Sequence, residues 1–169
     1  LKIVQQFVLA NEVGEIRPLK IGHINDSFIV ASASAGGTSY FLQKINHNIF
    51  KDVVGLQKNI QIVTDHLRKK LTEAGVKNID KRVLQLVPTQ DDKLFYQDEE
   101  GNYWRMYVNL ENTHSFDVIN PELAYKAGEA FGDFQCMLSD IPHDQLIETI
   151  PDFHNMEFRL HQFRVAVER

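Results

Sequence analysis

The sequence lacks features that several classes of protein require. Its 169 residues include one cysteine, Cys136, so no disulfide can form within the chain and a reducing compartment is expected. No apolar run approaches the roughly 18 residues of a membrane-spanning helix. The first residues do not follow the pattern of a signal peptide. We therefore expect a cytoplasmic protein with no membrane partner.

Positive charge is also scarce. The 18 lysines and arginines are outnumbered by 23 aspartates and glutamates, which gives a formal net charge of -5. This balance argues against a protein that binds nucleic acid by general electrostatic attraction. The one dense basic run, Arg68–Lys70, is typical of a solvated helix face. We therefore expect no nucleic-acid partner.

Two motif classes are missing as well. The sequence contains no Cys-x-x-Cys or His-Glu-x-x-His spacing, so a zinc site is not expected. No Gly-Lys-Ser/Thr triplet is present, which excludes a Walker loop. Apolar residues nevertheless make up 43% of the chain. A chain of this size can bury about 70% of its unfolded surface, so it needs no metal or disulfide to fold.

Hydrophobic periodicity divides the chain into two parts. The first part is rich in strands, with a short helix expected over 3–9 and a long helix that Asp52 caps and Gly75 ends. The expected strand ranges, of which the last three form two or three strands, are 16–20, 26–33, 39–45, 82–87, 93–97 and 102–110.

The second part is helical. Asn120-Pro121-Glu122 is a helix start with a capping side chain, a first-turn proline and an acid near the positive end of the dipole. A further helix is expected from Phe158 to Val167. The change of pattern between Leu110 and His114 divides the chain into residues 1–111 and 112–169.

Two stretches of the first part are suited to binding phosphate. The turn after the first strand contains Gly22, His23, Asn25 and Ser27, and its backbone N–H groups and side chains can donate to phosphate oxygens. In the third strand, Lys44 follows apolar neighbours and can bind nucleotide phosphates. The alternatives are a plain hairpin turn and a solvent-facing lysine. The order of turn, hairpin, strand lysine and long helix is that of a protein-kinase-like N-terminal lobe.

Several short stretches carry a resemblance to a known family. They are Gly22–Phe28, Tyr40–Asn46, Asn59–Ile60, Val63–Leu67, Trp104–Tyr107, Ala127–Gln135 and Glu148–His154. These stretches resemble the aminoglycoside phosphotransferase and choline kinase superfamily, and within it the N-acetylhexosamine 1-kinase branch. The resemblance runs along nearly all of this chain but only along the first half of such an enzyme.

The resemblance implies an α+β fold: a kinase-like N-terminal lobe with an antiparallel five-stranded sheet and one long helix, followed by the first helices of a helical C-terminal lobe. It implies ATP and magnesium as cofactors and a small-molecule sugar as substrate. The turn from Gly22 to Ser27 then covers the ATP phosphates. Gln43 or Lys44 occupies the strand position of the phosphate-binding base. Lys44 is the chemically suited one, although it shifts the alignment by one residue.

Two further features follow from the resemblance. The long helix is expected to carry an acidic partner for the strand base, but Lys58 occupies the position before Asn59. The hinge that reads adenine is expected at Val108, Asn109, Leu110 and Glu111, where the composition changes.

The catalytic residues of such a kinase are not in this sequence. None of its seven histidines begins the His-x-Asp triplet of the catalytic loop. We therefore expect the catalytic base and the magnesium ligands beyond Arg169, and this fragment to be inactive by itself. Truncated helices are expected to expose apolar faces and to cause self-association.

The sequence leaves the function open between two classes. One is a kinase for a sugar hydroxyl, with choline, homoserine or an aminoglycoside as alternative acceptors for the same fold. The other is a noncatalytic, pseudokinase-like binding module, which Lys58 favours.

Overall fold

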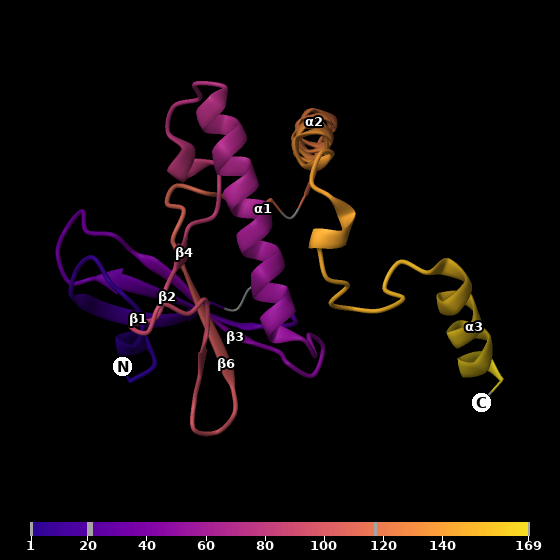
Figure 1. Ribbon diagram of the computed structural model, residues 1–169, viewed down its shortest axis with the longest axis horizontal. Coiled ribbons are helices and arrows are strands. Elements are labelled where there is room, and N and C mark those ends of the chain that lie inside the picture. Colours follow the sequence, from indigo (N-terminus) through magenta and orange to yellow (C-terminus); the bar gives the residue numbers. More distant parts are fainter. Residues whose placement is uncertain (1, 20–21, 117, 169) are drawn as a thin grey trace.

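An antiparallel β-sheet forms the first half of the molecule (Figure 1). The computed structural model describes residues 2–19, 22–116 and 118–168. The strands are β1 (Val13–Leu19), β2 (Asp26–Ser32), β3 (Tyr40–Ile45), β4 (Leu86–Val87), β5 (Tyr96–Gln97) and β6 (Tyr103–Val108). Their order is β1-β2-β3-β6-β4, with β5 also paired to β6. The expected hairpin of β2 and β3 is confirmed, whereas Lys20, the predicted end of the first strand, lies outside the described residues.

The sheet has six strands where the sequence predicts five. The short strands β4 and β5 pair with successive stretches of the same edge of β6, so together they fill one strand position. Both are shorter than predicted because nearby turns use their backbone groups. The N–H groups of Arg82 and Val83 donate to the carbonyl oxygen of Ile79, and Thr89 and Lys93 exchange hydrogen bonds across a tight turn.

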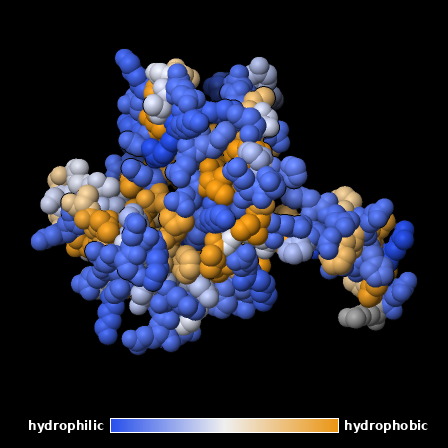
Figure 2. Space-filling model, viewed as in Figure 1, coloured by the Kyte–Doolittle hydropathy of each residue, from blue (hydrophilic) through white to orange (hydrophobic). Residues whose placement is uncertain are grey.

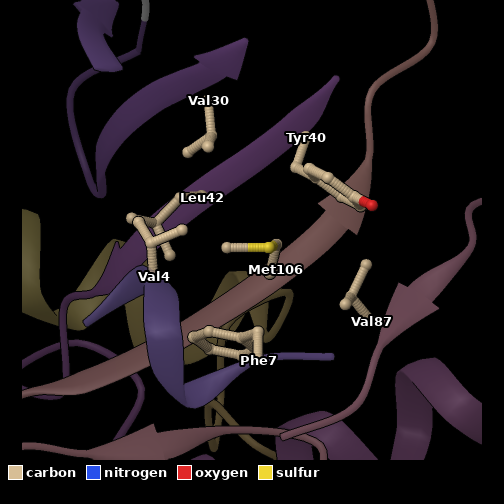
Figure 3. Packing of buried hydrophobic residues seen from close by; sticks show 7 residues of the cluster. All are labelled: Val4, Phe7, Val30, Tyr40, Leu42, Val87 and Met106. Atoms are coloured by element: carbon tan, nitrogen blue, oxygen red, sulfur yellow. The ribbon is translucent and has the colours of Figure 1, made fainter. Parts of the chain in front are cut away.

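One face of the sheet carries the apolar core (Figure 3). Its buried residues are Val4, Phe7, Val30, Tyr40, Leu42, Val87 and Met106. The N-terminal segment covers this face. It forms a single 3-10 turn, η1 (Val4–Gln6), instead of the helix predicted over 3–9. The reason is that the Val8 N–H donates to the carbonyl oxygen of Pro88 at 2.9 Å, so the chain continues in an extended form instead of a helix.

The long helix α1 (Val53–Glu73) begins and ends as predicted. The Asp52 side chain accepts a hydrogen bond from the Gly55 N–H at 2.8 Å, and Gly75 follows the helix with a φ of +66°. In Figure 1, α1 and the N-terminal segment lie on opposite sides of the sheet. The sheet face opposite to the apolar core is therefore the one that faces α1.

Two helices follow the sheet: α2 (Pro121–Leu138), capped by Asn120, and α3 (Met156–Val167), capped by Asn155. A 3-10 turn, η3 (His143–Gln145), lies between them, and another, η2 (Ile79–Lys81), follows α1. The predicted start of α2 is confirmed, and α3 begins two residues before the predicted Phe158. In the described residues, no helix is long and apolar enough to cross a membrane.

The end of α2 is held beside α1 by polar contacts. Lys70 of α1 donates to the carbonyl oxygen of Met137 at 2.9 Å and to the carboxylate of Asp140 at 2.6 Å. His66, one turn earlier in α1, contacts the same two acceptors through Nε2. By contrast, α3 stands apart from the sheet (Figure 1), and apolar side chains lie on its surface (Figure 2).

Candidate functional site

The turn from Gly22 to Ser27 lies at the end of the sheet where β2 begins. Gly22 has a φ of +89°, which favours glycine, and open space surrounds the position of a Cβ. His23 is exposed. The Asn25 side chain accepts a hydrogen bond from the Asn46 N–H at 2.9 Å, which ties the turn to the end of β3. Lys20 and Ile21, which precede this turn in the sequence, lie outside the described residues.

A row of polar side chains crosses the sheet beside this turn. Ser27 of β2, Gln43 of β3 and Arg105 of β6 are direct cross-strand partners. Gln43 Nε2 donates to Ser27 Oγ at 3.1 Å. Arg105 donates to Gln43 Oε1 from Nε at 3.0 Å and from Nη2 at 2.9 Å. Because alternate residues of a strand share a face, this row lies on the face opposite to the core.

The half-buried side chain of Arg105 has no counterion among the described residues, and its Nη1 atom is buried. Its Nη1 has no hydrogen-bond partner in the described part of the chain, and no carboxylate there forms an ion pair with it. The Tyr107 ring lies 5.3 Å from the guanidinium carbon. Burial lowers the pKa of Arg105 and raises that of the Tyr107 hydroxyl. A buried donor left unpaired costs about 1–3 kcal/mol, so an anion that pairs with Nη1 removes a cost already present.

Helix α1 carries a second side chain with unpaired buried atoms, the amide of Gln57. Gln57 is 1% exposed, and neither Oε1 nor Nε2 has a hydrogen-bond partner among the described residues. The neighbouring Lys58, which the family resemblance placed at the position of the acidic partner, is exposed. The buried residues of α1 are Val53, Gly55, Gln57, Thr64 and Leu67. None of these is acidic, so the buried residues of α1 offer no carboxylate to the strand cation.

Lys44 lies on the other face of the sheet. It is the cross-strand partner of Trp104, and its Nζ is 5.9 Å from the centre of the Trp104 ring. Trp104 packs against the apolar core that contains Leu42. The structure therefore brings Gln43, and not Lys44, together with Ser27 beside the glycine turn.

The expected hinge lies at the opposite end of the same strands. Val108 N–H donates to the carbonyl oxygen of Gln85, and Asn109 N–H to that of Ser39, both at 2.9 Å. Leu110 and Glu111 follow, and their N–H groups make no hydrogen bond within the described chain. These residues border a hollow of about 370 Å³. Within the described chain, Leu110 and Glu111 therefore keep unused backbone donors beside this hollow.

The Val108 side chain lies on the core face of the sheet. It packs against the apolar core instead of facing the row of polar side chains. The reason is strand alternation: Val108 pairs with the core residue Tyr40, and it is an odd number of residues from Arg105. The Leu110 side chain is half-buried, and the Glu111 carboxylate accepts a hydrogen bond from Ser39 Oγ at 3.0 Å.

The sequence assigned no role to two residues that the structure shows with unpaired buried polar atoms, Arg105 and Gln57. Arg105 belongs to a stretch that resembles the kinase family, and Gln57 precedes another. Alternation along β6 places Arg105 on the opposite face from its two neighbours in the strand. Its position beside Gln43 could not be found in this way, because the pairing of β3 with β6 joins residues that are 62 positions apart. The signal for Gln57 was its spacing of four residues from Val53 on one helix face.

The overall structure is similar to a known phosphotransferase. No protein-family model matches the sequence. Among solved structures, the chain is similar to spectinomycin phosphotransferase, APH(9)-Ia, in complex with ADP and spectinomycin, with a TM-score of 0.51 and 15% sequence identity. The similarity covers 85% of this chain and 38% of that protein. At this identity the likeness shows the fold, which is α+β and kinase-like as the resemblance implied.

Magnesium does not fit the residues described. In the ranges 2–19, 22–116 and 118–168, no group of three histidine, cysteine or acidic residues is placed to hold a metal ion. The described residues therefore offer polar and cationic side chains, but no such cluster of metal ligands.

Proposed function

We propose that this chain is the nucleotide-binding lobe, with the first helices of the catalytic lobe, of an ATP-dependent small-molecule kinase. In this proposal residues 1–111 form the nucleotide lobe and 112–169 begin the helical one. The observation that carries it is the placement of two sets of candidate residues at opposite ends of strands β3 and β6. The turn at Gly22 and the Gln43 row lie at one end, and the hinge lies at the other.

The spacing of these groups suits a nucleotide. Arg105 and Val108, where β6 ends just before Leu110 and Glu111, are three residues apart, which at roughly 3.3 Å per residue is about 10 Å. An adenine held by the Leu110 and Glu111 backbone can then extend its phosphates toward the turn. The N–H groups there, with the side chains of His23 and Asn25, are the proposed donors.

The chemistry of such a kinase is mostly positioning and charge neutralisation. The γ-phosphoryl group is transferred from the leaving oxygen to the attacking oxygen, and these two oxygens lie roughly in line with it. The lobe holds the phosphates in place and balances their charge. Magnesium, if it is used, is proposed to be held by residues outside this chain. The same applies to the base that orients the acceptor hydroxyl.

The proposed acceptor is a sugar hydroxyl, as in N-acetylhexosamine 1-kinases. This specificity rests on the resemblance of the sequence stretches. The fold of APH(9)-Ia supports a phosphotransferase of this architecture without selecting the acceptor. Choline, homoserine and an aminoglycoside are the alternatives. A noncatalytic nucleotide-binding module is the second candidate, and the missing carboxylate on the buried residues of α1 favours it.

Nucleotide binding is tested with the 169-residue chain itself. Titration of ¹⁵N-labelled protein with ADP is expected to shift the amide signals of Gly22 to Ser27 and of Leu110 to Glu111. Adenosine is expected to shift the hinge signals alone. Shifts confined to surface residues of α2 and α3 would contradict the proposed site. Absence of any shift at millimolar ADP would contradict nucleotide binding.

The acceptor is tested with a longer form of the protein that includes a His-x-Asp loop. Phosphate transfer from ATP is measured over N-acetylhexosamines, choline, homoserine and aminoglycosides. Turnover of an N-acetylhexosamine is the expected result. Tight nucleotide binding without turnover of any acceptor would favour the noncatalytic module.

The exposed apolar faces of α2 and α3 support a further proposal, that the 169-residue chain associates with itself. Tyr125 and Phe131 of α2, and Phe163 of α3, are each more than 60% exposed. Faces of this kind drive association in water.

A further inference from the structure

We infer that Arg105 is the residue that binds the nucleotide phosphates, and that Gln43 positions it. The inference rests on the proposed function. It assigns the phosphate-binding cation to β6 and not to β3, where the family resemblance places Gln43 or Lys44.

The first support is the geometry of the guanidinium. Nε and Nη2 donate to one oxygen, Gln43 Oε1, and the guanidinium carbon lies over the Tyr107 ring, 5.3 Å from its centre. These contacts fix the orientation of the group and leave Nη1 as its unpartnered end. A guanidinium held in this way presents two parallel N–H donors, a geometry that matches a phosphate group.

The second support is the absence of a competing carboxylate. In protein kinases, a glutamate of the long helix pairs with the strand lysine and neutralises it. Here the inward position of α1 is occupied by Gln57, which carries no charge, and Lys58 is exposed. Within the described residues, Arg105 therefore keeps its whole charge available for an anion.

The third support is the connection of Arg105 to the glycine turn. Gln43 Oε1 accepts a hydrogen bond from the guanidinium, and Gln43 Nε2 donates one to Ser27, the last residue of the turn and already part of β2. Ser27 is 5% exposed, and Gln43 and Arg105 are half-buried, so the row is partly shielded from solvent next to the turn. A phosphate that contacts the backbone N–H groups near Gly22 lies at the same end of the sheet as the guanidinium.

Gln43 has to be neutral for this arrangement. A glutamate at the same position would accept the same two hydrogen bonds from Arg105 with a full negative charge. It would then form a buried ion pair and compete with the phosphate. The amide of Gln43 orients the guanidinium without neutralising it.

The test compares three ligands and three variants of the 169-residue chain. The ligands are ADP, adenosine and inorganic tripolyphosphate, each titrated into ¹⁵N-labelled protein. Tripolyphosphate and ADP are expected to shift the side-chain Nε–H signal of Arg105, whereas adenosine leaves it unchanged. Arg105→Gln is expected to weaken ADP binding about tenfold or more, which corresponds to about 1.4 kcal/mol, with little change for adenosine.

Two further variants separate a binding role from a structural one. Gln43→Glu is expected to weaken ADP binding to a similar degree while the melting temperature of the free chain stays the same or rises. A merely structural Gln43 would tolerate this change without losing affinity. Lys44 lies on the opposite face of the sheet. Lys44→Gln removes one positive charge, as Arg105→Gln does, and is expected to change the ADP affinity less than twofold.

The outcomes are distinct. If Arg105→Gln binds ADP as the unaltered chain does, or if Lys44→Gln loses the affinity instead, Arg105 is not the phosphate-binding residue although the proposed function stands. If the unaltered chain binds neither ADP nor adenosine, the proposed function fails and the inference fails with it. Should Arg105→Gln not fold, Gln43→Glu and the Nε–H shift of Arg105 in the unaltered chain decide the question.

Discussion

Asn59 of α1 makes two hydrogen bonds with the backbone of Ile147. Its Nδ2 donates to the Ile147 carbonyl oxygen at 2.7 Å, and its Oδ1 accepts from the Ile147 N–H at 2.9 Å. The two residues are 88 positions apart. This pair joins the helix of the first part of the chain to the segment that follows α2.

Replacing Asn59 by alanine is expected to release that segment. At about 0.5–1.5 kcal/mol for each hydrogen bond, the loss of two amounts to about 1–3 kcal/mol. Hydrogen exchange of the Ile147 amide is expected to become faster, since its acceptor is gone. The exposed neighbour Lys58 provides the control: Lys58→Ala should leave the exchange of Ile147 unchanged. Equal protection in Asn59→Ala would show that other contacts hold the segment.

Glycine to alanine substitutions are expected to act in opposite directions in the two long helices. Alanine normally stabilises a helix interior by about 0.8–1.0 kcal/mol relative to glycine. At Gly128 of α2, a Cβ would meet no atom within 4 Å, so Gly128→Ala should raise the unfolding temperature. At Gly55 of α1, a Cβ would overlap the Asp52 carboxylate that caps the helix. Gly55→Ala is therefore expected to displace the cap, which is worth about 1 kcal/mol, and to lose the gain.

Thermal unfolding followed by circular dichroism compares these two variants directly. An equal increase in both would mean that the Asp52 cap adjusts without cost.

Acid is expected to loosen the hairpin between β5 and β6. The Asp98 carboxylate accepts hydrogen bonds from the Asn102 N–H at 2.8 Å and from the Trp104 indole at 2.8 Å. Partial burial alone raises the pKa of Asp98, but the hydrogen bonds from Trp104 and Asn102 outweigh it and leave the pKa below its ordinary value. The carboxylate therefore stabilises the hairpin above a pH of about 3.9, the ordinary value, and this contribution is lost as the pH falls through the lowered one.

Trp104 reports this change because it is the only tryptophan in the chain. Its emission is expected to shift as the pH falls below about 4, before the helical circular dichroism signal is lost. In Asp98→Asn the shift should be absent, since the amide does not titrate. The same acid shift in that variant would assign the transition to another carboxyl group.

Self-association is expected to depend on the apolar faces of α2 and α3. Phe131 is 63% exposed and Phe163 is 65% exposed. Light scattering after size exclusion should show species larger than 19.5 kDa whose share falls in the double variant Phe131→Ser, Phe163→Ser. Glu129→Gln, an exposed polar change in α2, is the control. A monomer at all concentrations would count against association.

Local patterns in the sequence were enough to predict most of the elements. The caps at Asp52 and Asn120 begin helices because a side-chain oxygen and a free N–H lie within three residues of each other. The hairpin of β2 and β3 follows from its turn residues and alternation. The turn at Gly22 follows from its glycine, whereas the hinge is a prediction from the family resemblance.

Only the tertiary structure decided which side chains share the site. Whether Gln43 or Lys44 faces the turn depends on which face of the sheet the N-terminal segment covers, and no local pattern contains that choice. Arg105 joins the row of polar side chains through a strand pairing between distant residues, and the packing of α1 buries Gln57. The sequence by itself determined the elements and their order, because these depend on neighbours in the chain. The site depends on contacts between residues far apart in the sequence, because side-chain direction becomes a position in space only when the strands pair.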